Sequence, residues 1–159
     1  MQSDSKSFDR VQKALELFFE GYNCSQAIAG AFADVMALSP EAAMRLVAGF
    51  GAGTGDHKGM CGALSSAIFV TGALHEPVGP ADLAAKKQLY ADVNALKAEF
   101  TEKFGTTNCG ELLRSAKALP KPDPSERNAE YYSRRPCAHF VATVAQLLEK
   151  GAGDRGPRK

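Results

Sequence analysis

The stretch CGALSSAIFVTGAL, residues 61–74, sets the architecture of this chain. It is apolar all round, and small residues recur within it, which predicts a central helix that neighbouring helices approach closely. At this length it is too short to span a bilayer, because a membrane helix needs roughly 17–25 residues. We therefore expect it to form the core of a water-soluble helical domain.

Apolar residues at helical spacing on both sides of this stretch predict the surrounding helices. No long segment alternates with a period of two, so we expect an all-α fold: a single compact bundle of about six or seven helices. The expected helices span about residues 8–20, 24–38, 40–47, 61–74, 81–104, a short segment from Cys109, and a last segment from Cys137. Pro120, Pro122 and Pro124 predict an extended connection.

Length and composition agree with one domain. The 159 residues are 45% hydrophobic, enough for a core of their own, and we expect residues 1–150 to form it. Residues 151–159 are Gly-rich and basic, and we expect a disordered tail. The formal net charge of +1 implies neither nucleic acid nor a membrane surface as a partner. The polar first residues lack the apolar core of a secretory signal, so we expect a cytoplasmic protein.

A glycine-rich segment precedes the central helix. Residues 49–59 (GFGAGTGDHKG) hold five glycines, which predicts an irregular loop whose backbone comes very close to something beside Cys61. The glycines fit neither the dinucleotide fingerprint nor the P-loop pattern, so nucleotide binding is not expected. His57 in this loop is a candidate proton or hydrogen-bond donor, although a solvated histidine is the more common case. We expect His139 to point away from the cysteine on its own helix.

Each of the four cysteines falls at the predicted start of a helix. Cys24 and Cys109 each follow an asparagine that can cap a helix, and Cys137 follows a proline. Cys61 opens the central helix after the glycine-rich loop. Unpaired amides and the positive end of the helix dipole favour a thiolate at such positions. We therefore expect thiol pKa values lowered from about 8.5 toward roughly 3.5–7.5.

The spacing of the cysteines contains no C-x-x-C pair, so any shared centre must be assembled by tertiary folding. A single cysteine is more often a buried structural residue that behaves as a small hydrophobe. Four cysteines at equivalent helix starts favour one thiolate centre over four independent core residues.

At these positions the chain resembles a family of redox-active proteins named for a lone cysteine, a Cys-Gly-Ala-x-x-Gly motif and two later lone cysteines (C_GCAxxG_C_C). The lone cysteine is Cys24, the central motif is residues 61–66 (CGALSS), and the later cysteines are Cys109 and Cys137. The resemblance covers most of the chain. It departs from the pattern at Ser66, which stands where the motif has its final glycine, a change that loosens a helix contact but removes no ligand.

The resemblance implies redox activity at the cysteines. A similar domain in split-Soret cytochromes looks like their iron–sulfur part, which implies that all four cysteines bind an iron–sulfur cluster, with [2Fe–2S] preferred, for electron transfer or small redox catalysis. A metal-free thiol–disulfide oxidoreductase needs only two sulfurs close together. A structural zinc-binding or interaction protein ranks below, because zinc ligands usually come in local pairs. Whether the chain is an enzyme stays open between these classes.

The expected partner is a redox protein or a small molecule, and a homodimer is a further expectation. The cluster Tyr131, Tyr132, Arg134 and Arg135 lies just before Cys137. Its aromatic and basic side chains indicate a surface or docking patch rather than nucleic-acid recognition.

Overall fold

Helices account for the fold, as the periodicity predicts. A computed structural model describes residues 3–118 and 126–153, and over this part it contains no β-strand. The elements are α1 (Ser3–Phe19), α2 (Cys24–Ala31), the 3-10 helix η1 (Ala33–Met36), α3 (Pro40–Val47), the 3-10 helix η2 (Ala48–Phe50), α4 (Gly51–Thr54), α5 (Gly62–Leu74), α6 (Leu83–Phe104), α7 (Cys109–Ser115), α8 (Ala129–Arg134) and α9 (Cys137–Gly153). The all-α prediction is confirmed.

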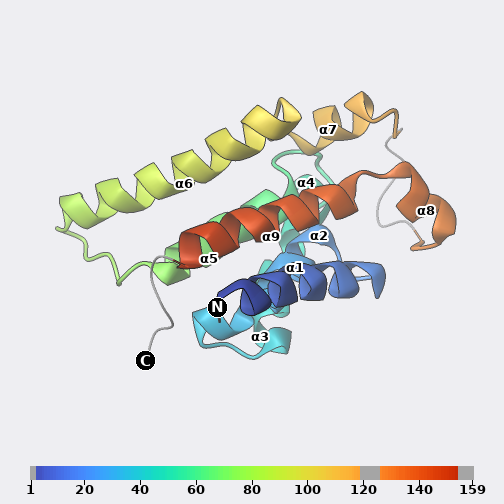
Figure 1. Cartoon of the computed structure of the whole chain (residues 1–159). Helices are drawn as coiled ribbons and strands as arrows, with labels where there is room; N and C mark the ends of the chain where they lie inside the picture. The colour runs from blue at the N-terminus through green and yellow to red at the C-terminus, as the bar shows by residue number, and fades with distance from the viewer. Residues whose placement is uncertain (1–2, 119–125, 154–159) are drawn as a thin grey trace.

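The central helix is α5, which packs against α2, α6 and α9. Its Leu64 and Val70 are fully buried, together with Ile28 of α2 and Phe100 of α6. Figure 1 shows α6 along one side of the bundle, with α1 and α3 on the other, and α1 running opposite to α9. As a result, α9 begins at the end of the bundle where α1 finishes.

The segment predicted as one helix over 24–38 is divided. α2 ends at Ala31, η1 follows, and Ala37 then takes a left-handed conformation with φ of 56°. Beyond this break, Ser39 precedes Pro40 and is extended, with φ of −68° and ψ of 152°, because a residue before proline avoids the helical region. The extended Ser39 separates η1 from the start of α3.

Two other bounds differ from the expectations. Helix α8 was not predicted, although Asn128 caps it by accepting a hydrogen bond from the Tyr131 amide. Helix α9 continues to Gly153, three residues into the segment expected to be a disordered tail. The rest of that tail, residues 154–159, and the connection through Pro120, Pro122 and Pro124 lie outside the described residues.

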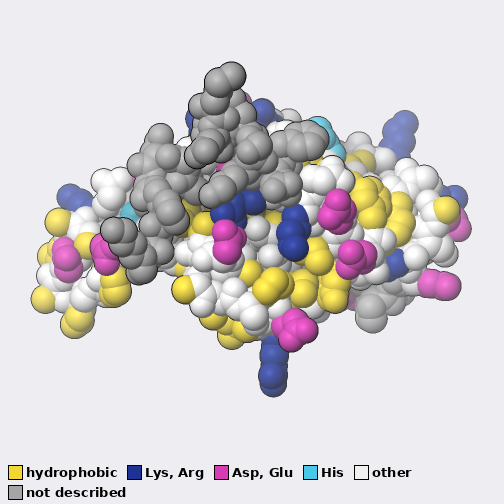
Figure 2. All heavy atoms as spheres, turned by 60° about the horizontal axis from the view of Figure 1, so that its bottom comes forward, with side chains coloured by type: hydrophobic (Ala, Val, Ile, Leu, Met, Phe, Trp, Pro, Cys, Tyr) yellow, Lys and Arg dark blue, Asp and Glu magenta, His cyan; other side chains and the backbone are white. Residues whose placement is uncertain are grey.

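The surface carries charges of both signs. Figure 2 shows Lys and Arg side chains interspersed with Asp, Glu and hydrophobic ones on the face turned toward the viewer. No helix within the described residues is both long and apolar enough to cross a membrane.

Candidate cysteine centre

All four cysteines line one cavity of about 560 Å³. They reach it from the starts of four different helices: Cys24 and Cys109 are the first residues of α2 and α7, Cys137 is the first of α9, and Cys61 is the N-cap of α5. The tertiary structure thus brings together residues that the sequence separates by long intervals. The four cysteines thus line a common cavity, while their binding of one shared metal centre stays a prediction.

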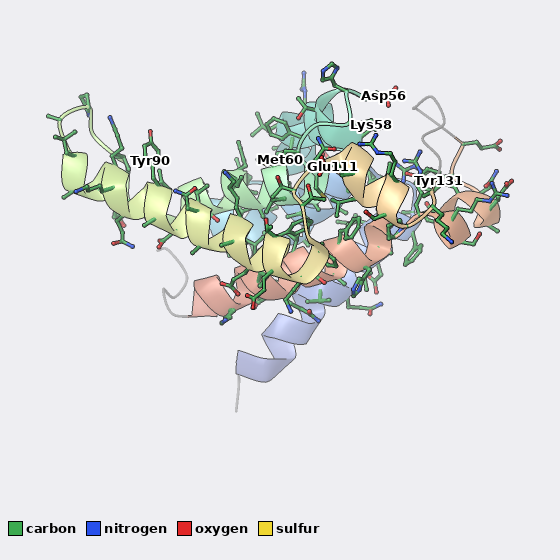
Figure 3. All side chains as sticks on the ribbon, turned by 90° about the horizontal axis from the view of Figure 1, so that it is seen from above. Asp56, Lys58, Met60, Tyr90, Glu111 and Tyr131 are labelled. Carbon is green, nitrogen blue, oxygen red and sulfur yellow. The ribbon has the colours of Figure 1, made fainter. Side chains whose placement is uncertain are left out.

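A short backbone ladder holds Cys61 beside Cys109. The Cys61 amide donates to the Thr107 carbonyl at 2.8 Å, and the Cys109 amide donates to the Gly59 carbonyl at 2.6 Å. Between them, Met60 and Asn108 form an isolated antiparallel bridge. Figure 3 shows Lys58 and Met60 next to the start of α7, where Glu111 lies. This pairing orders the end of the glycine-rich segment and fixes the approach of two of the four sulfurs.

Capping hydrogen bonds position Cys24. The Asn23 side chain accepts from the Gln26 amide at 2.9 Å and donates to the Ala48 carbonyl at 3.0 Å. The Ser25 hydroxyl donates to the Val47 carbonyl at 2.8 Å. The start of α2 is therefore tied both to its own first turn and to the segment that follows α3.

The backbone approaches Cys24 closely, as expected of the glycine-rich region. A Cβ atom added at Gly62 would lie 2.6 Å from the Cys24 sulfur and 2.7 Å from the Phe50 carbonyl oxygen. The segment expected to be an irregular loop contains η2 and the single distorted turn α4, in which Ala52 and Gly53 have positive φ values of 55° and 75°. This conformation brings the Ala52 amide within hydrogen-bonding reach of Cys24.

Burial, rather than the helix dipole, dominates the thiol pKa values, so the expectation of lowered values is wrong for three cysteines. Desolvation by burial raises the pKa of Cys24, and the amides of Ala52 and Ala63 and the charge of Arg127 offset part of this rise. Burial and the negative charge of neighbouring thiolates raise the pKa of Cys61 well above its ordinary value.

The pKa of Cys137 rises to about 12, first through burial and then through the thiolate charges of Cys24 and Cys109. Arg135 and Arg127 oppose this rise. Although Cys24 and Cys137 keep part of their surface open to the cavity, protein atoms surround them on the other sides. Without a bound cation, these thiols are therefore protonated at neutral pH.

The potential ligand atoms at the cavity are the sulfurs of four cysteines from separate helix starts. Within the described residues, no three His, Cys, Asp or Glu side chains form a group that could hold a metal ion. The four thiols instead surround a cavity, and backbone amides and two guanidinium groups act on their sulfurs. An iron–sulfur cluster brings its own sulfides and spans several ångströms, so four cysteines around a cavity suit its ligand count and its negative charge.

A family model described as "Putative redox-active protein (C_GCAxxG_C_C)" matches residues 22–151. The chain belongs to this family. The C_GCAxxG_C_C region thus contains all four cysteines and every element that lines their cavity except the end of α1. Comparison with curated proteins and with solved structures gave no match.

Ser66, the departure from the C_GCAxxG_C_C motif, makes a contact of its own. It is fully buried, and its hydroxyl donates to the Ser25 carbonyl at 2.8 Å. The serine therefore links α5 to the first turn of α2, next to Cys24, rather than loosening this contact.

Three cavity residues come from the region expected to be a surface patch or just before it. Arg127, Tyr131 and Arg135 line the cavity, while the Tyr132 hydroxyl donates to the Phe18 carbonyl at 3.1 Å. Only Arg134 of the expected patch is solvent-exposed and paired on the surface, with Glu130. Arg127 was missed because no local pattern marks it; its one sequence signal is its place beside the capping Asn128.

The histidines lie away from the cysteines. His57 is exposed and is not part of the cavity lining, so the structure does not bring this candidate to the site; Asp56 lines the cavity instead. The His139 ring packs edge-on against Phe104, with 5.3 Å between the ring centroids. This agrees with the expectation that His139 points away from Cys137. His75 contacts Asp92 at 2.8 Å.

Proposed function

We propose that this protein holds an iron–sulfur cluster on Cys24, Cys61, Cys109 and Cys137 and uses it in electron transfer or small redox catalysis. The observation that carries the proposal is that four thiols from four separate helix starts line one cavity. Membership of a family described as redox-active supports it. Both [2Fe–2S] and [4Fe–4S] clusters take four thiolate ligands, and we propose a [2Fe–2S] cluster as the first type to test.

The charges around the cavity support an anionic occupant. Backbone amides of Ala52 and Ala63 act on the Cys24 sulfur, and the Leu64 amide acts on the Cys61 sulfur. Arg127 and Arg135 add two positive charges near Cys137. Hydrogen bonds and positive charge around cluster sulfurs stabilise the reduced state and raise the reduction potential. When bound, the cluster supplies one-electron chemistry, and these residues of the chain hold and tune it.

A metal-free thiol–disulfide oxidoreductase is the second candidate. Such an enzyme needs a thiolate as the attacking group. Burial raises the pKa values of Cys24, Cys61 and Cys137, which makes thiolates scarce at neutral pH. Bound iron would compensate for this burial, because it replaces the thiol protons. The raised pKa values therefore weigh against Cys24, Cys61 and Cys137 as metal-free nucleophiles.

Anaerobic purification and reconstitution test the proposal. We expect stoichiometric iron and acid-labile sulfide, together with a visible spectrum that bleaches on reduction. Cys61→Ser should lose most of the iron, whereas the matched control Ser65→Ala, on the same helix, should retain it. A folded, fully reduced protein that takes up no iron would overturn the proposal. Loss of two thiols on mild oxidation of that iron-free protein would indicate the thiol–disulfide alternative.

A further inference from the structure

The wall of the cysteine cavity contains a turn with an unusual backbone. Five consecutive residues, 52–56, have positive φ values between 55° and 75°. Three of them, Ala52, Thr54 and Asp56, carry a side chain, whose Cβ atom approaches a neighbouring carbonyl oxygen in this conformation at a cost in free energy. Thr54 is the least favourable of the three, because its side chain is branched at Cβ. This left-handed turn (residues 52–56) is therefore strained.

Both ends of the left-handed turn are fixed on the site. Before it, an added Cβ atom on Gly51 would lie 2.4 Å from the Asn23 side-chain nitrogen, so the chain packs tightly against the cap of α2. After it, the Lys58 carbonyl accepts from the Gly110 amide at 3.2 Å, as part of the ladder to α7. A change in conformation is therefore confined to the residues between these two anchors.

Most of the chain between these anchors is exposed. Residues 54–57 lie at the surface, whereas Gly53 is buried. Two hydrogen bonds lie within this segment: the Lys58 amide donates to the Ala52 carbonyl at 3.1 Å, and the Gly59 amide donates to the Gly53 carbonyl at 2.9 Å. Helices α2 and α5, which form other walls of the cavity, are buried over much of their length. Exposed segments that bury little apolar surface open locally at a lower free energy than core helices.

The left-handed turn contacts the site through Cys24. Ala52, Gly55 and Asp56 line the cavity, and the Ala52 amide lies within hydrogen-bonding reach of the Cys24 sulfur. A sulfur that ligates iron carries negative charge, and hydrogen bonds to charged acceptors are stronger than those to neutral ones. A ligand shifts a conformational equilibrium only through interactions that differ between the two conformations. The hydrogen bond from Ala52 supplies such a difference.

We propose that the left-handed turn is a movable wall of the cysteine cavity, which opens more often while the site is empty and closes on Cys24 when the site is filled. This inference rests on the proposed function for the identity of the occupant, and it adds the route by which iron and sulfide reach the sulfurs. Strain at Thr54 favours the open conformation. The hydrogen bond from the Ala52 amide to the Cys24 sulfur favours the closed one.

Hydrogen exchange of the reduced, metal-free protein tests whether the wall moves. Exchange would be followed by mass spectrometry at neutral pH on a peptide that covers residues 52–59 and on a peptide from α5. We expect the hydrogen-bonded amides of Gly55, Lys58 and Gly59 to exchange roughly tenfold faster than those of α5, or faster still. Exchange as slow as in α5 would overturn the inference.

Substitution of Thr54 links this motion to the strain. Thr54→Gly removes the side chain from an exposed position with φ of 68°, which glycine adopts readily. We expect this variant to slow both exchange in residues 52–59 and alkylation of Cys24 by iodoacetamide about threefold, with a thermal midpoint no lower than that of the wild-type protein. The matched control Thr54→Val keeps the branched Cβ, so both rates should stay close to wild-type values. Rates in the glycine variant that equal or exceed those in the valine variant would contradict the proposed role of strain.

Iron loading tests the closure. We expect it to slow exchange in residues 52–59 roughly tenfold while exchange in α3 stays unchanged, and we expect Thr54→Gly to slow the release of iron to a chelator. Iron that binds without changing exchange in the left-handed turn would overturn the inference, although the proposed function would stand. A protein that takes up no iron would overturn the proposed function together with the closure on Cys24, whereas fast exchange that Thr54→Gly slows would still support the movable wall.

Discussion

Gly62 lies against the Cys24 sulfur at the point where α5 begins beside α2. The space there is too small for even one methyl group, since an added Cβ would also meet the Phe50 carbonyl oxygen. A backbone oxygen cannot move aside as a flexible side chain can. The glycine of the Cys-Gly-Ala motif therefore serves the approach of two helices and one candidate ligand.

Substitution of this glycine tests the close approach. We expect Gly62→Ala to lower the free energy of unfolding by about 1–3 kcal/mol through overpacking, and to reduce iron uptake because Cys24 is displaced. Gly72→Ala on the same helix is the matched control, since an added Cβ there meets nothing within 4 Å. It should stabilise the protein by about 0.5–1 kcal/mol. Equal effects of the two variants in urea unfolding would contradict the predicted contact.

Burial of the thiols predicts a distinct pH dependence for the reduced, metal-free protein. Because the fold raises the pKa values of Cys24, Cys61 and Cys137, it favours their protonated forms. This contribution to stability is fully present below the unfolded pKa of about 8.5 and is lost as pH rises toward about 12, the pKa of Cys137. We therefore expect urea unfolding midpoints to fall above pH 9.

Alkylation gives a second measure of the same effect. At pH 7.5 we expect iodoacetamide to modify the folded metal-free protein far more slowly than the urea-unfolded chain. In Cys137→Ala the fall in stability above pH 9 should be smaller than in the wild-type protein. A rate of alkylation that levels off near pH 6 would contradict the raised pKa values and restore the dipole-stabilised thiolates expected from the sequence.

At the scale of the elements, helix N-caps position two of the cysteine sulfurs. Asn23 and Asn108 cap α2 and α7, and each is followed directly by a cysteine. Because the capping side chain fixes the backbone of the first turn, it also fixes the direction in which that cysteine leaves the helix. The cap of α2 does more, since Asn23 also donates to the Ala48 carbonyl.

Removal of this cap should affect both stability and the site. We expect Asn23→Ala to lower the free energy of unfolding by about 1–2 kcal/mol and to decrease the iron content. Ser39→Ala removes the cap of α3, away from the cavity, and should cost about 1 kcal/mol without a change in iron. Thermal unfolding and iron analysis of both variants check this. Loss of iron from the Ser39 variant as well would show that stability alone controls iron content.

The sequence predicts a helix well wherever the helix buries an apolar stripe or begins with an N-capping residue. Periodicity predicted α5, α6 and α9 closely because their apolar residues face one core. Gly105 ends α6 in a left-handed conformation. Periodicity failed to predict an element whose formation depends on tertiary contacts. Helix α8 is held by the Tyr132 hydroxyl on the Phe18 carbonyl, a contact between distant parts of the chain that no local pattern encodes.

At the scale of the whole molecule, the candidate site depends on folding. The order of the cysteines and their helix starts could be predicted from the sequence, but their arrangement around a cavity required the ladder between residues 58–61 and 107–110. The thiolate expectation was wrong because a helix dipole acts locally, whereas desolvation reflects everything packed around the sulfur. The same packing explains why Arg127 could not be recognised.

Whether the four cysteines are protected from alkylation together distinguishes one shared centre from separate cysteines. The iron-loaded protein would be alkylated without oxygen, unfolded in a chelator, labelled with a second reagent, and analysed by mass spectrometry at each cysteine. We predict that Cys24, Cys61, Cys109 and Cys137 are all protected while iron is bound, and that all four become reactive together when it is removed. Protection of only two of them, or rapid alkylation of all four with iron still bound, would contradict a single four-cysteine centre.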